Sequence, residues 1–437
     1  MKVKEIILLI FIIAAGVFFY HAYTGKIYIN LDWGEGIFFN LDEFVYEESQ
    51  EIDPPFLPEL EIINAHGDVE IQGTEDQRVT IFFQKEIWRK NKEQADKVAE
   101  ELQMTVNKDD QRLTISTNRA DFRRKRFRTN FRIHVPAGMD IKVKNSYGLV
   151  KTLKVGKTDI INPHGKIVAM DIGGDLFIQN KYRDIEVENV QSDCQIDSRH
   201  SSVTVNGVKG EINIVHRYGN IHLEDISQGV TVEGSHTEVF GQRIAGSVDI
   251  ETSYKKIILF DVGPTEIRGR HSRIEVDGAR ENLEIYDRYG KVILNNIQGN
   301  LKIDGKNLGV SGTGITGEKI FISTSYKNIK LTEFSGTTTI LLSNGEVVLK
   351  PYPLTHPVEV KGEYADIKFY WPSGEKYPFE ARVKSGDIKW EVPAEFNYQE
   401  ENSFTIIKAF VQEKEKPSVF LSTTYGTIRI EVTEHTN

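Results

Sequence analysis

The sequence predicts an all-β protein built as a parallel β-solenoid, a single-stranded β-helix with about 18 residues per coil. Three observations lead to this prediction. A tyrosine or histidine recurs at an almost constant interval, apolar residues follow each of them at fixed offsets, and glycines recur between the apolar groups.

The recurring anchors alternate strictly between tyrosine and histidine at intervals of 17 or 18 residues. They are Tyr147, His164, Tyr182, His200, Tyr218, His236, Tyr254, His271 and Tyr289. The pattern continues less regularly at Tyr326, Tyr364 and Tyr425, where several prolines indicate wider coils with bulging turns.

Apolar residues recur 3, 5, 8, 12 and 14 positions after each anchor. The unit of Tyr218 supplies Ile221, Leu223, Ile226, Val230 and Val232. Apolar residues two apart are typical of a strand with one buried face. Each unit is therefore expected to hold two short strands, with glycines such as Gly210 and Gly246 at the corners.

Two strands with one apolar face each cannot form a stable body alone, so successive units are expected to stack along one axis. A left-handed helix of hexapeptides would need an apolar residue 2 positions after the anchor, where Ser202, Asn220 and Glu238 stand instead. A right-handed coil is favoured, because parallel crossover connections are almost always right-handed.

Stacking would bring the anchors into one column, in which rings lie upon rings as a structural ladder. A metal stripe is the alternative for its histidines. Histidines of alternate coils would lie ~9.6 Å apart, too far to share an ion with bonds of ~2.0–2.1 Å. The column is therefore expected to be structural, and no metal or cofactor is expected.

The chain is expected to have four parts. These are a signal anchor or transmembrane helix at 1–25, an acidic linker at 26–57, an N-terminal α+β cap at 58–140, and the solenoid repeats at 141–437. The cap contains the segment KEQADKVAEELQ, whose apolar residues have helical spacing, and it would cover the open edge of the solenoid.

The N-terminal segment predicts a membrane attachment. Lys2 and Lys4 precede an uninterrupted apolar run from Ile6 to Tyr20, and aromatic residues end it as at a membrane interface. A retained single-pass anchor is favoured over a cleaved signal peptide, because no small-residue cleavage site is evident. The bulk of the chain is then expected to be extracytoplasmic, with the cell membrane as a partner.

Composition excludes several classes of function. The net charge of −10 argues against a general nucleic-acid binder. Cys194 is the only cysteine, so the chain can form no internal disulfide. Cys194 also falls at an inward position of its unit, and it is therefore expected to be a core residue and not a nucleophile.

One run of charge stands out, the segment FRRKRFR. Its cations are Arg123, Arg124, Lys125, Arg126 and Arg128. A solvated loop of the cap is the first interpretation. Contact with anionic lipid headgroups or an envelope polymer is the second, and nucleic acid is the weakest.

The segments INAHGDVEIQG and FRIHVPAGMDIKVKNSYGLV, with the serial YG turns that follow them, resemble the bacterial "putative adhesin" family of exported β-strand-repeat domains of unknown function. The resemblance covers about residues 60–437. It implies the repeat fold and an exported protein, and it brings no catalytic residue with it.

The sequence therefore predicts a non-catalytic, membrane-tethered, extracytoplasmic module with an adhesin-like binding or scaffold function at the cell envelope. One alternative is a regulatory or sensory ectodomain that binds a membrane protein. A β-helical polysaccharide enzyme comes third, because its paired carboxylates would need equal registers in neighbouring coils, and Asp171, Asp175, Asp184 and Glu186 are scattered.

Overall fold

The computed structural model describes residues 41–54, 58–109, 112–374, 376–392, 395–410, 412–413 and 415–432. It divides into two units, Met1–Lys151 and Thr152–Asn437. No helix within the described ranges is long and apolar enough to cross a membrane. The expected membrane segment, 1–25, lies outside them.

The first unit is a set of short strands with one α-helix. Its elements are β1 (Asp42–Ile52), β2 (Glu59–Ile63), β3 (Val69–Thr74), β4 (Val79–Arg89), α2 (Lys92–Glu101), β5 (Met104–Lys108), β6 (Arg112–Thr117), η1 (Arg119–Asp121), β7 (Phe127–Pro136) and β8 (Asp140–Lys144). One group of strands has the order β1, β4, β7, β3, and only its β7–β3 pair is parallel. The other has the order β5, β6, β2, β8, with an antiparallel β5–β6 hairpin.

The helix expected within the cap is α2. Asn91 caps it, because its side-chain oxygen accepts a hydrogen bond from the backbone N–H of Gln94 at 3.0 Å. The helix buries Ala95 and Ala99 in a small cluster with Ile87 of β4. Its apolar stripe therefore holds it against the strands.

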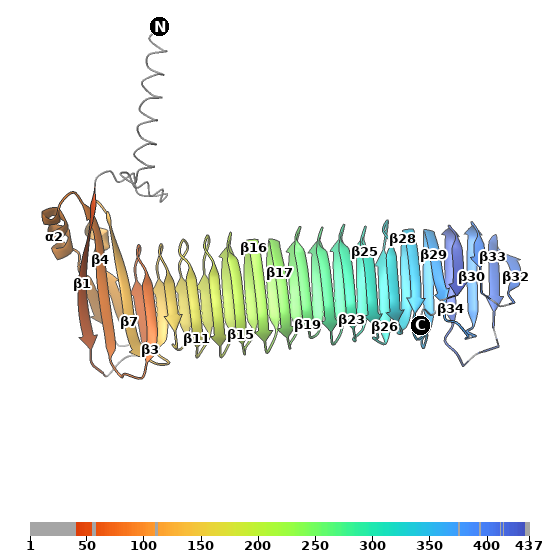
Figure 1. Ribbon diagram of the computed structural model, residues 1–437, viewed down its shortest axis with the longest axis horizontal. Helices are drawn as coiled ribbons and strands as arrows, with labels where there is room; N and C mark the ends of the chain where they lie inside the picture. Colours follow the sequence, from red (N-terminus) through yellow and green to blue (C-terminus); the bar gives the residue numbers. More distant parts are fainter. Residues whose placement is uncertain are drawn as a thin grey trace, which may run out of the picture. The chain divides into compact units, whose positions relative to one another are not determined.

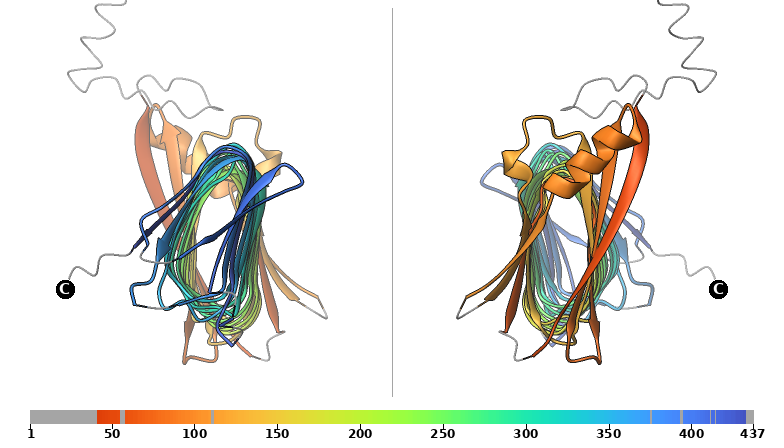
Figure 2. Two further views of the ribbon diagram at one scale, coloured as in Figure 1. Left: turned by 90° about the vertical axis from the view of Figure 1, so that its right-hand side faces the viewer. Right: turned by 90° about the vertical axis from the view of Figure 1, so that its left-hand side faces the viewer.

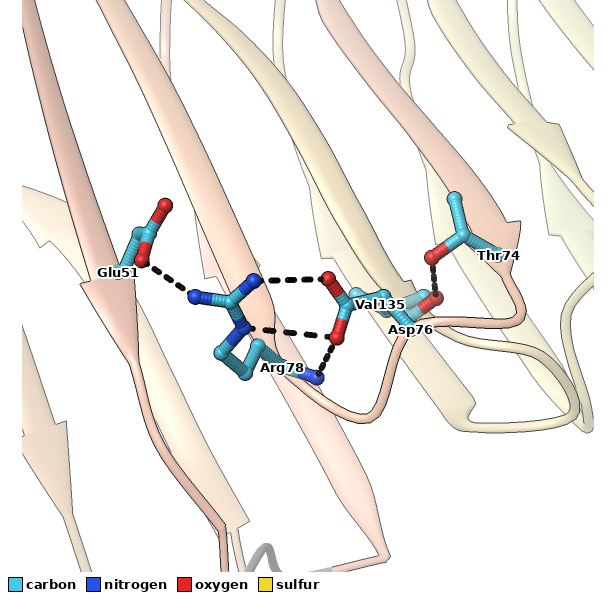
Figure 3. A network of polar contacts seen from close by, with 5 residues as sticks. All are labelled: Glu51, Thr74, Asp76, Arg78 and Val135. Carbon is cyan, nitrogen blue, oxygen red and sulfur yellow. Dashed lines mark hydrogen bonds and ion pairs between the residues drawn. The ribbon is translucent and has the colours of Figure 1, made fainter.

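The N-terminal edge differs from the expected linker, because residues 42–52 form strand β1 in register with β4. Phe44 and Tyr46 alternate along it and pack against the cluster beneath α2. Arg78 lies 2.9 Å from Glu51 of β1 and 3.2 Å from Asp76, and Figure 3 shows these contacts. The acidic side chains of this strand are thus exposed to water or paired with cations, while Phe44 and Tyr46 pack the strand against the cluster beneath α2.

The second unit is a row of coils stacked in parallel (Figure 1). One face of its coils is built from β11 (Ile167–Ile172), β13 (Ile185–Val190), β15 (Ser202–Val208), β19 (Lys256–Val262), β21 (Arg273–Ala279), β23 (Lys291–Ile297), β25 (Gly309–Ile315), β27 (Ile329–Phe334), β31 (Ile388–Trp390) and β35 (Ile428–Val432). The strand β9 (Val150–Leu153) crosses the division between the units.

The opposite face is built from β10 (Thr158–Ile161), β12 (Leu176–Gln179), β14 (Cys194–Arg199), β18 (Val248–Ser253), β20 (Thr265–Arg270), β22 (Leu283–Arg288), β24 (Leu301–Lys306), β26 (Lys319–Thr324), β30 (Phe379–Ser385) and β34 (Val419–Tyr425). Four long strands turn the corner and belong to both faces: β16 (Ile212–Ile226), β17 (Val230–Ile244), β28 (Thr337–Pro351) and β29 (Val358–Trp371). Seen along the row, the coils superimpose as a flattened loop (Figure 2).

The expected all-β parallel solenoid is confirmed by the pairing register. Strand β16 pairs in parallel with β17, and Ile212 lies beside Val230 and Ile221 beside Val239. The inward side chains of each coil fill the space between the two faces, where Ile221 is 1% exposed and Val230 is 2% exposed. The right-handed winding stays a prediction.

The third apolar residue of each unit falls at offset 8 and not at 7 because of a second bend. The residue at offset 7 has a left-handed backbone, as at Asp225 with φ 56° and Asn296 with φ 54°. This conformation uses one extra residue before the chain turns inward again at Ile226 or Ile297. Asparagine, aspartate and glycine recur here because they tolerate positive φ best.

The C-terminal coils change order. The last strands of the chain, β34 and β35, pair with β29 on one side, and with β30 and β31 on the other. The antiparallel strands β32 (Asn397–Glu401) and β33 (Phe404–Ala409) then extend the sheet from β30. Glu400 and Glu401 are exposed on β32, and charges on such an outer strand discourage pairing with another chain.

The alternation of buried and exposed positions can be tested at two adjacent residues of β16. Ile214 is 1% exposed, so Ile214→Asp would bury a charge with no partner and should lower the free energy of unfolding by about 3 kcal/mol or more. Asn213 is exposed between Gln195 and Thr231 of the neighbouring coils, so Asn213→Asp should change it by under ~0.5 kcal/mol. Urea unfolding measures both, and equal losses would contradict the assigned faces.

Candidate functional site: an aromatic and basic edge

Eight of the anchor residues form a ladder of stacked rings at one corner of the second unit. The ladder consists of His164, Tyr182, His200, Tyr218, His236, Tyr254, His271 and Tyr289. Neighbouring ring centroids lie 4.9–6.0 Å apart, with interplanar angles of 3–20°. The ninth anchor, Tyr147, lies in the first unit, where its ring stacks on His66 at 4.4 Å.

Six of the eight ladder residues, His200 and those after it, occupy a backbone conformation that aromatic side chains seldom adopt. Tyr218 has a φ of 63° and His271 has a φ of 58°, both in the left-handed region that glycine and asparagine prefer. After Tyr289 the same corner is taken by Asn307, with a φ of 53°. The tight corner therefore requires this conformation, and stacking between rings offsets its cost.

The exposed part of the ladder is made of ring edges. Tyr182, Tyr218 and Tyr289 are 52%, 51% and 54% exposed, although each is stacked between neighbouring rings or against one. Stacking covers the ring faces, so what remains for solvent is the edge, which carries a phenol hydroxyl or an imidazole nitrogen. The ladder thus presents hydrogen-bonding groups and few free aromatic faces.

A row of cations lies beside the ladder, one position before the ladder residue in five coils and before Asn307 in a sixth. This basic row consists of Lys181, Arg199, Arg217, Arg270, Arg288 and Lys306, and all six are exposed. Arg199 lies in register with Arg217, and Arg288 with Lys306. The N–H of His271 donates to the carbonyl oxygen of Arg288 at 2.7 Å, so the corner itself fixes the register of the row.

The basic row differs from the other cations on the coils. Arg268 lies 3.0 Å from Asp249 and Lys302 lies 3.4 Å from Glu284 in adjacent coils, and Arg243 binds Asp225. Within the described ranges, no member of the basic row forms an ion pair with a carboxylate. The row therefore concentrates uncompensated positive charge on a chain whose net charge is −10.

Beneath the ladder lies a column of buried polar side chains, two positions before each anchor. Its members include Asn162, Asn180, Ser198, His216, Thr252, Asp287 and Thr324. Asn180 shows their role, because its side-chain nitrogen donates to the carbonyl oxygens of Asn162 and Gly165, each at 2.7 Å. Most of these side chains form hydrogen bonds with backbone groups that the sharp corner withdraws from the regular hydrogen bonding between strands.

The largest members of the buried column fit because a glycine lies opposite. A Cβ added at Gly219 would meet the Nε2 atom of His216 at 2.6 Å, and one added at Gly290 would meet the Oδ2 atom of Asp287 at 2.0 Å. Where the column residue is glycine, the opposite residue is larger, as for Gly305 beside Leu308. At these corners a large side chain and a glycine thus lie opposite one another.

Two titratable groups of the buried column have shifted pKa values. Burial lowers the pKa of His216 to about 4, and the neighbouring His200 adds to this effect. The Nδ1 atom of His216 lies 2.7 Å from the hydroxyl of Ser198. Burial raises the pKa of Asp287 to about 6, although its oxygens accept hydrogen bonds from the backbone N–H groups of Ser272 and Arg288.

The structure also places the residues that the sequence had marked for chemistry. Cys194 is 1% exposed, and burial raises the pKa of its thiol to about 12, so this thiol is a core group with very little thiolate at neutral pH. Among the described residues, no three histidine, cysteine or acidic side chains come together as a metal site.

The FRRKRFR segment follows η1 in the first unit and runs into the start of β7, and its five cations are all exposed. The last two cations have contacts within the unit. The carbonyl oxygen of Arg126 accepts a hydrogen bond from the side chain of Arg89 at 3.0 Å, and the guanidinium of Arg128 lies 5.6 Å from the ring of Trp88.

The ladder was predicted from the sequence, whereas the basic row and the buried column were not. Both have the same interval as the anchors, so counting one and two positions backwards from each anchor would have revealed them. The position before the anchor is basic for five of the nine anchors, and Lys306 precedes Asn307, which takes the place of an anchor in the next coil. The position two before is polar or glycine in nearly every unit.

A comparison with protein families agrees with the repeat architecture for part of the chain. A family model described as Toastrack DUF4097 matches residues 261–431, and it confirms for that part the resemblance to a β-strand-repeat family of unknown function. A solved structure of a "putative cell adhesion protein" from Clostridium sporogenes is 10% identical, with a TM-score of 0.16, and the match covers 89% of this chain and 100% of that chain. None of the curated proteins matches the chain.

The buried histidine predicts a pH dependence of stability. The unfolded chain takes up a proton at His216 below about 6.5, whereas the folded chain does so only near 4. The unfolded state binds more protons in this window, so the contribution of His216 to the free energy of unfolding falls as pH drops from about 6.5 to about 4. His216→Asn, which copies Asn180, should remove this contribution, on the order of 3 kcal/mol.

Urea unfolding of the wild type and of His216→Asn at pH 7 and pH 4 measures this effect. Asp287→Asn is the control of opposite sign. Its raised folded pKa of about 6 means that the contribution of Asp287 is present below about 3.8 and is lost as pH rises through about 6. A difference between wild type and His216→Asn that does not change with pH would contradict the assignment.

Proposed function

We propose that the protein is a non-catalytic, adhesin-like binding or scaffold module, with the ladder and the basic row as its binding surface. The single observation that carries this proposal is the row of six exposed cations beside the half-exposed ladder, none of which forms an ion pair with a carboxylate among the described residues. Like charges that lie opposite one another on neighbouring strands destabilise the pairing of those strands. A bound partner of opposite charge would offset this cost.

The repeated character of the surface supports binding over catalysis. Equivalent side chains recur coil after coil at ~4.8 Å intervals, so the surface offers the same contact many times. Catalysis requires a few unlike groups held at one place, and the ladder and the basic row supply like groups along a line. The family resemblance brings no catalytic residue to these positions.

The proposal includes attachment to the cell membrane through the N-terminal segment, with the solenoid outside the cytoplasm. This part rests on the sequence, in which Lys2 and Lys4 precede the apolar run from Ile6 to Tyr20. A second contact with anionic lipid or an envelope polymer is proposed at the cluster of Arg123, Arg124, Lys125, Arg126 and Arg128. Protease added to intact cells should digest the solenoid if this orientation holds.

The proposed binding surface can be tested by photo-crosslinking in cells that produce the full chain. A photoreactive phenylalanine analogue in place of Tyr218 or Tyr254 should form adducts with envelope material, because these rings are 51% and 48% exposed on the ladder. The same analogue in place of Tyr398, which is 59% exposed outside the ladder, is the matched control. Adducts are read as shifted bands on a denaturing gel.

Adducts at the two ladder positions and few at Tyr398 would support the proposal. Equal yields at all three positions, or none at the ladder, would contradict the assignment of the binding surface. A solenoid that resists added protease until the cells are lysed would separately contradict the extracytoplasmic orientation.

A further inference from the structure

We propose that the basic row and the ladder bind a linear polyanion, an extended chain of phosphate, sulfate or carboxylate groups lying along the stack of coils. This inference rests on the proposed binding function and names its ligand class. Cationic side chains would contact the anionic groups, and the ring edges of the ladder would donate hydrogen bonds beside them.

The arrangement of the cations fits a chain better than a small anion. Lys181, Arg199 and Arg217 lie in three consecutive coils, and Arg270, Arg288 and Lys306 lie in three more. Between them, two coils carry Ser235 and Ser253 in the row. At a coil spacing of ~4.8 Å the row spans ~34 Å, a length that only an extended ligand can contact throughout.

The stacking of the ladder argues against a ligand that binds by stacking its own rings on those of the ladder. A nucleic-acid base or a sugar that binds aromatic residues usually lies on a free ring face. Here each inner ring has neighbours on both sides, at 5.0 Å and 4.9 Å for His236. Only the ring edges remain exposed, and their hydroxyl and imidazole N–H groups can donate hydrogen bonds to acceptor oxygens. We therefore expect the protein to bind the anionic groups of the ligand.

Charges beside the row argue for a narrow ligand over a broad anionic surface. Two positions before the row, on the same outward face, Asp197 and Asp304 stand beside its cations, Glu233 and Glu251 stand beside its serines, and Arg268 is a cation of the same column. A flat anionic membrane would approach these carboxylates as closely as the cations and would be repelled by them. A single chain lying on the corner can follow the cations and keep away from that flank.

The test uses the full chain, solubilised with detergent where needed, and long-chain polyphosphate labelled for fluorescence anisotropy at low ionic strength. Wild type should bind and release the polymer as salt rises, because exposed charge contacts are screened. The variant Arg199→Ser, Arg217→Ser, Arg270→Ser and Arg288→Ser should bind about tenfold more weakly or worse, with a shallower salt dependence.

A charge-matched control removes four cations from ion pairs elsewhere on the coils. It combines Arg243→Ser, Arg268→Ser, Arg273→Ser and Lys302→Ser. This control should retain most of the binding, because the lost cations lie off the row. Thermal unfolding of both variants checks that each is folded. The pair Tyr218→Asn and Tyr254→Asn, which repeats the asparagine found at Asn307, tests the ladder without a change of charge.

Unlabelled long polymer, tripolyphosphate and anionic-lipid vesicles are compared as competitors of the labelled polymer to identify the ligand class. Tripolyphosphate at equal total phosphate should compete at least about tenfold less well than the long polymer, and anionic-lipid vesicles should compete less well than the polymer. Equal loss of binding in both charge-matched variants would overturn the inference. Vesicles that compete better than the polymer would overturn it in favour of a membrane surface.

Removal of binding by Arg123→Ser, Arg124→Ser and Lys125→Ser would also overturn the inference, because it would place the contact in the first unit. Failure of the wild type to bind any of the polyanions, with adducts still formed at Tyr218, would reject the polyanion and leave the proposed binding surface standing. Failure of both experiments would reject the proposed function itself.

Discussion

The parallel backbone pairing between successive coils is the constraint on which the rest of the second unit depends. Up to β29, each coil places its residues beside those 17–20 positions further along the chain, as Ile221 lies beside Val239 and Ile257 beside Ile274. A side-chain choice made in one coil is thereby repeated as a column. The apolar core, the ladder, the basic row and the buried polar column are four consequences of one register.

The corner that carries the ladder shows how these columns support one another. A left-handed residue turns the chain at Tyr218, and it frees backbone groups that must find partners. Side chains such as Asn180 and Thr237 bond those groups from beneath. Above them, ring stacking joins neighbouring corners, so the exposed edge is rigidly supported. Such support keeps the six cations of the basic row in line, although their mutual repulsion would tend to spread them.

Much of the solenoid could be predicted because its period is short and exact repetition is visible in one sequence. The offsets of Ile221, Leu223 and Val230 identified inward positions, and all three are buried. The bend before Ile226 was not predicted, although the apolar position itself was, because nothing in the offsets shows the left-handed backbone of Asp225 that moves this position by one residue. Strand β1 was not predicted, because its acidic residues outnumber Phe44 and Tyr46, and only pairing with β4 makes it a strand.

The candidate site was predicted in part. Tyr218 and its equivalents were recognised as a column, but Arg199 and Arg217 were not, since a cation gains meaning only when its partners in the neighbouring coils are known. The unusual pKa values of His216 and Asp287 arise from burial beneath the corner, and composition does not show burial. The C-terminal change of coil order, with β34 between β29 and β30, has no local sequence signal at all.

Deletion of whole repeats tests the central claim about the register most directly. Removal of residues 218–253 takes out two complete units and joins Arg217 to Tyr254 with every column intact. Removal of residues 218–244 takes out one and a half units and joins Arg217 to Ala245 out of register. The measurement is thermal unfolding followed by circular dichroism. The register account predicts a cooperative transition close to that of the wild type for the first deletion, and a lost or much earlier one for the second. Two deletions that unfold alike would contradict it.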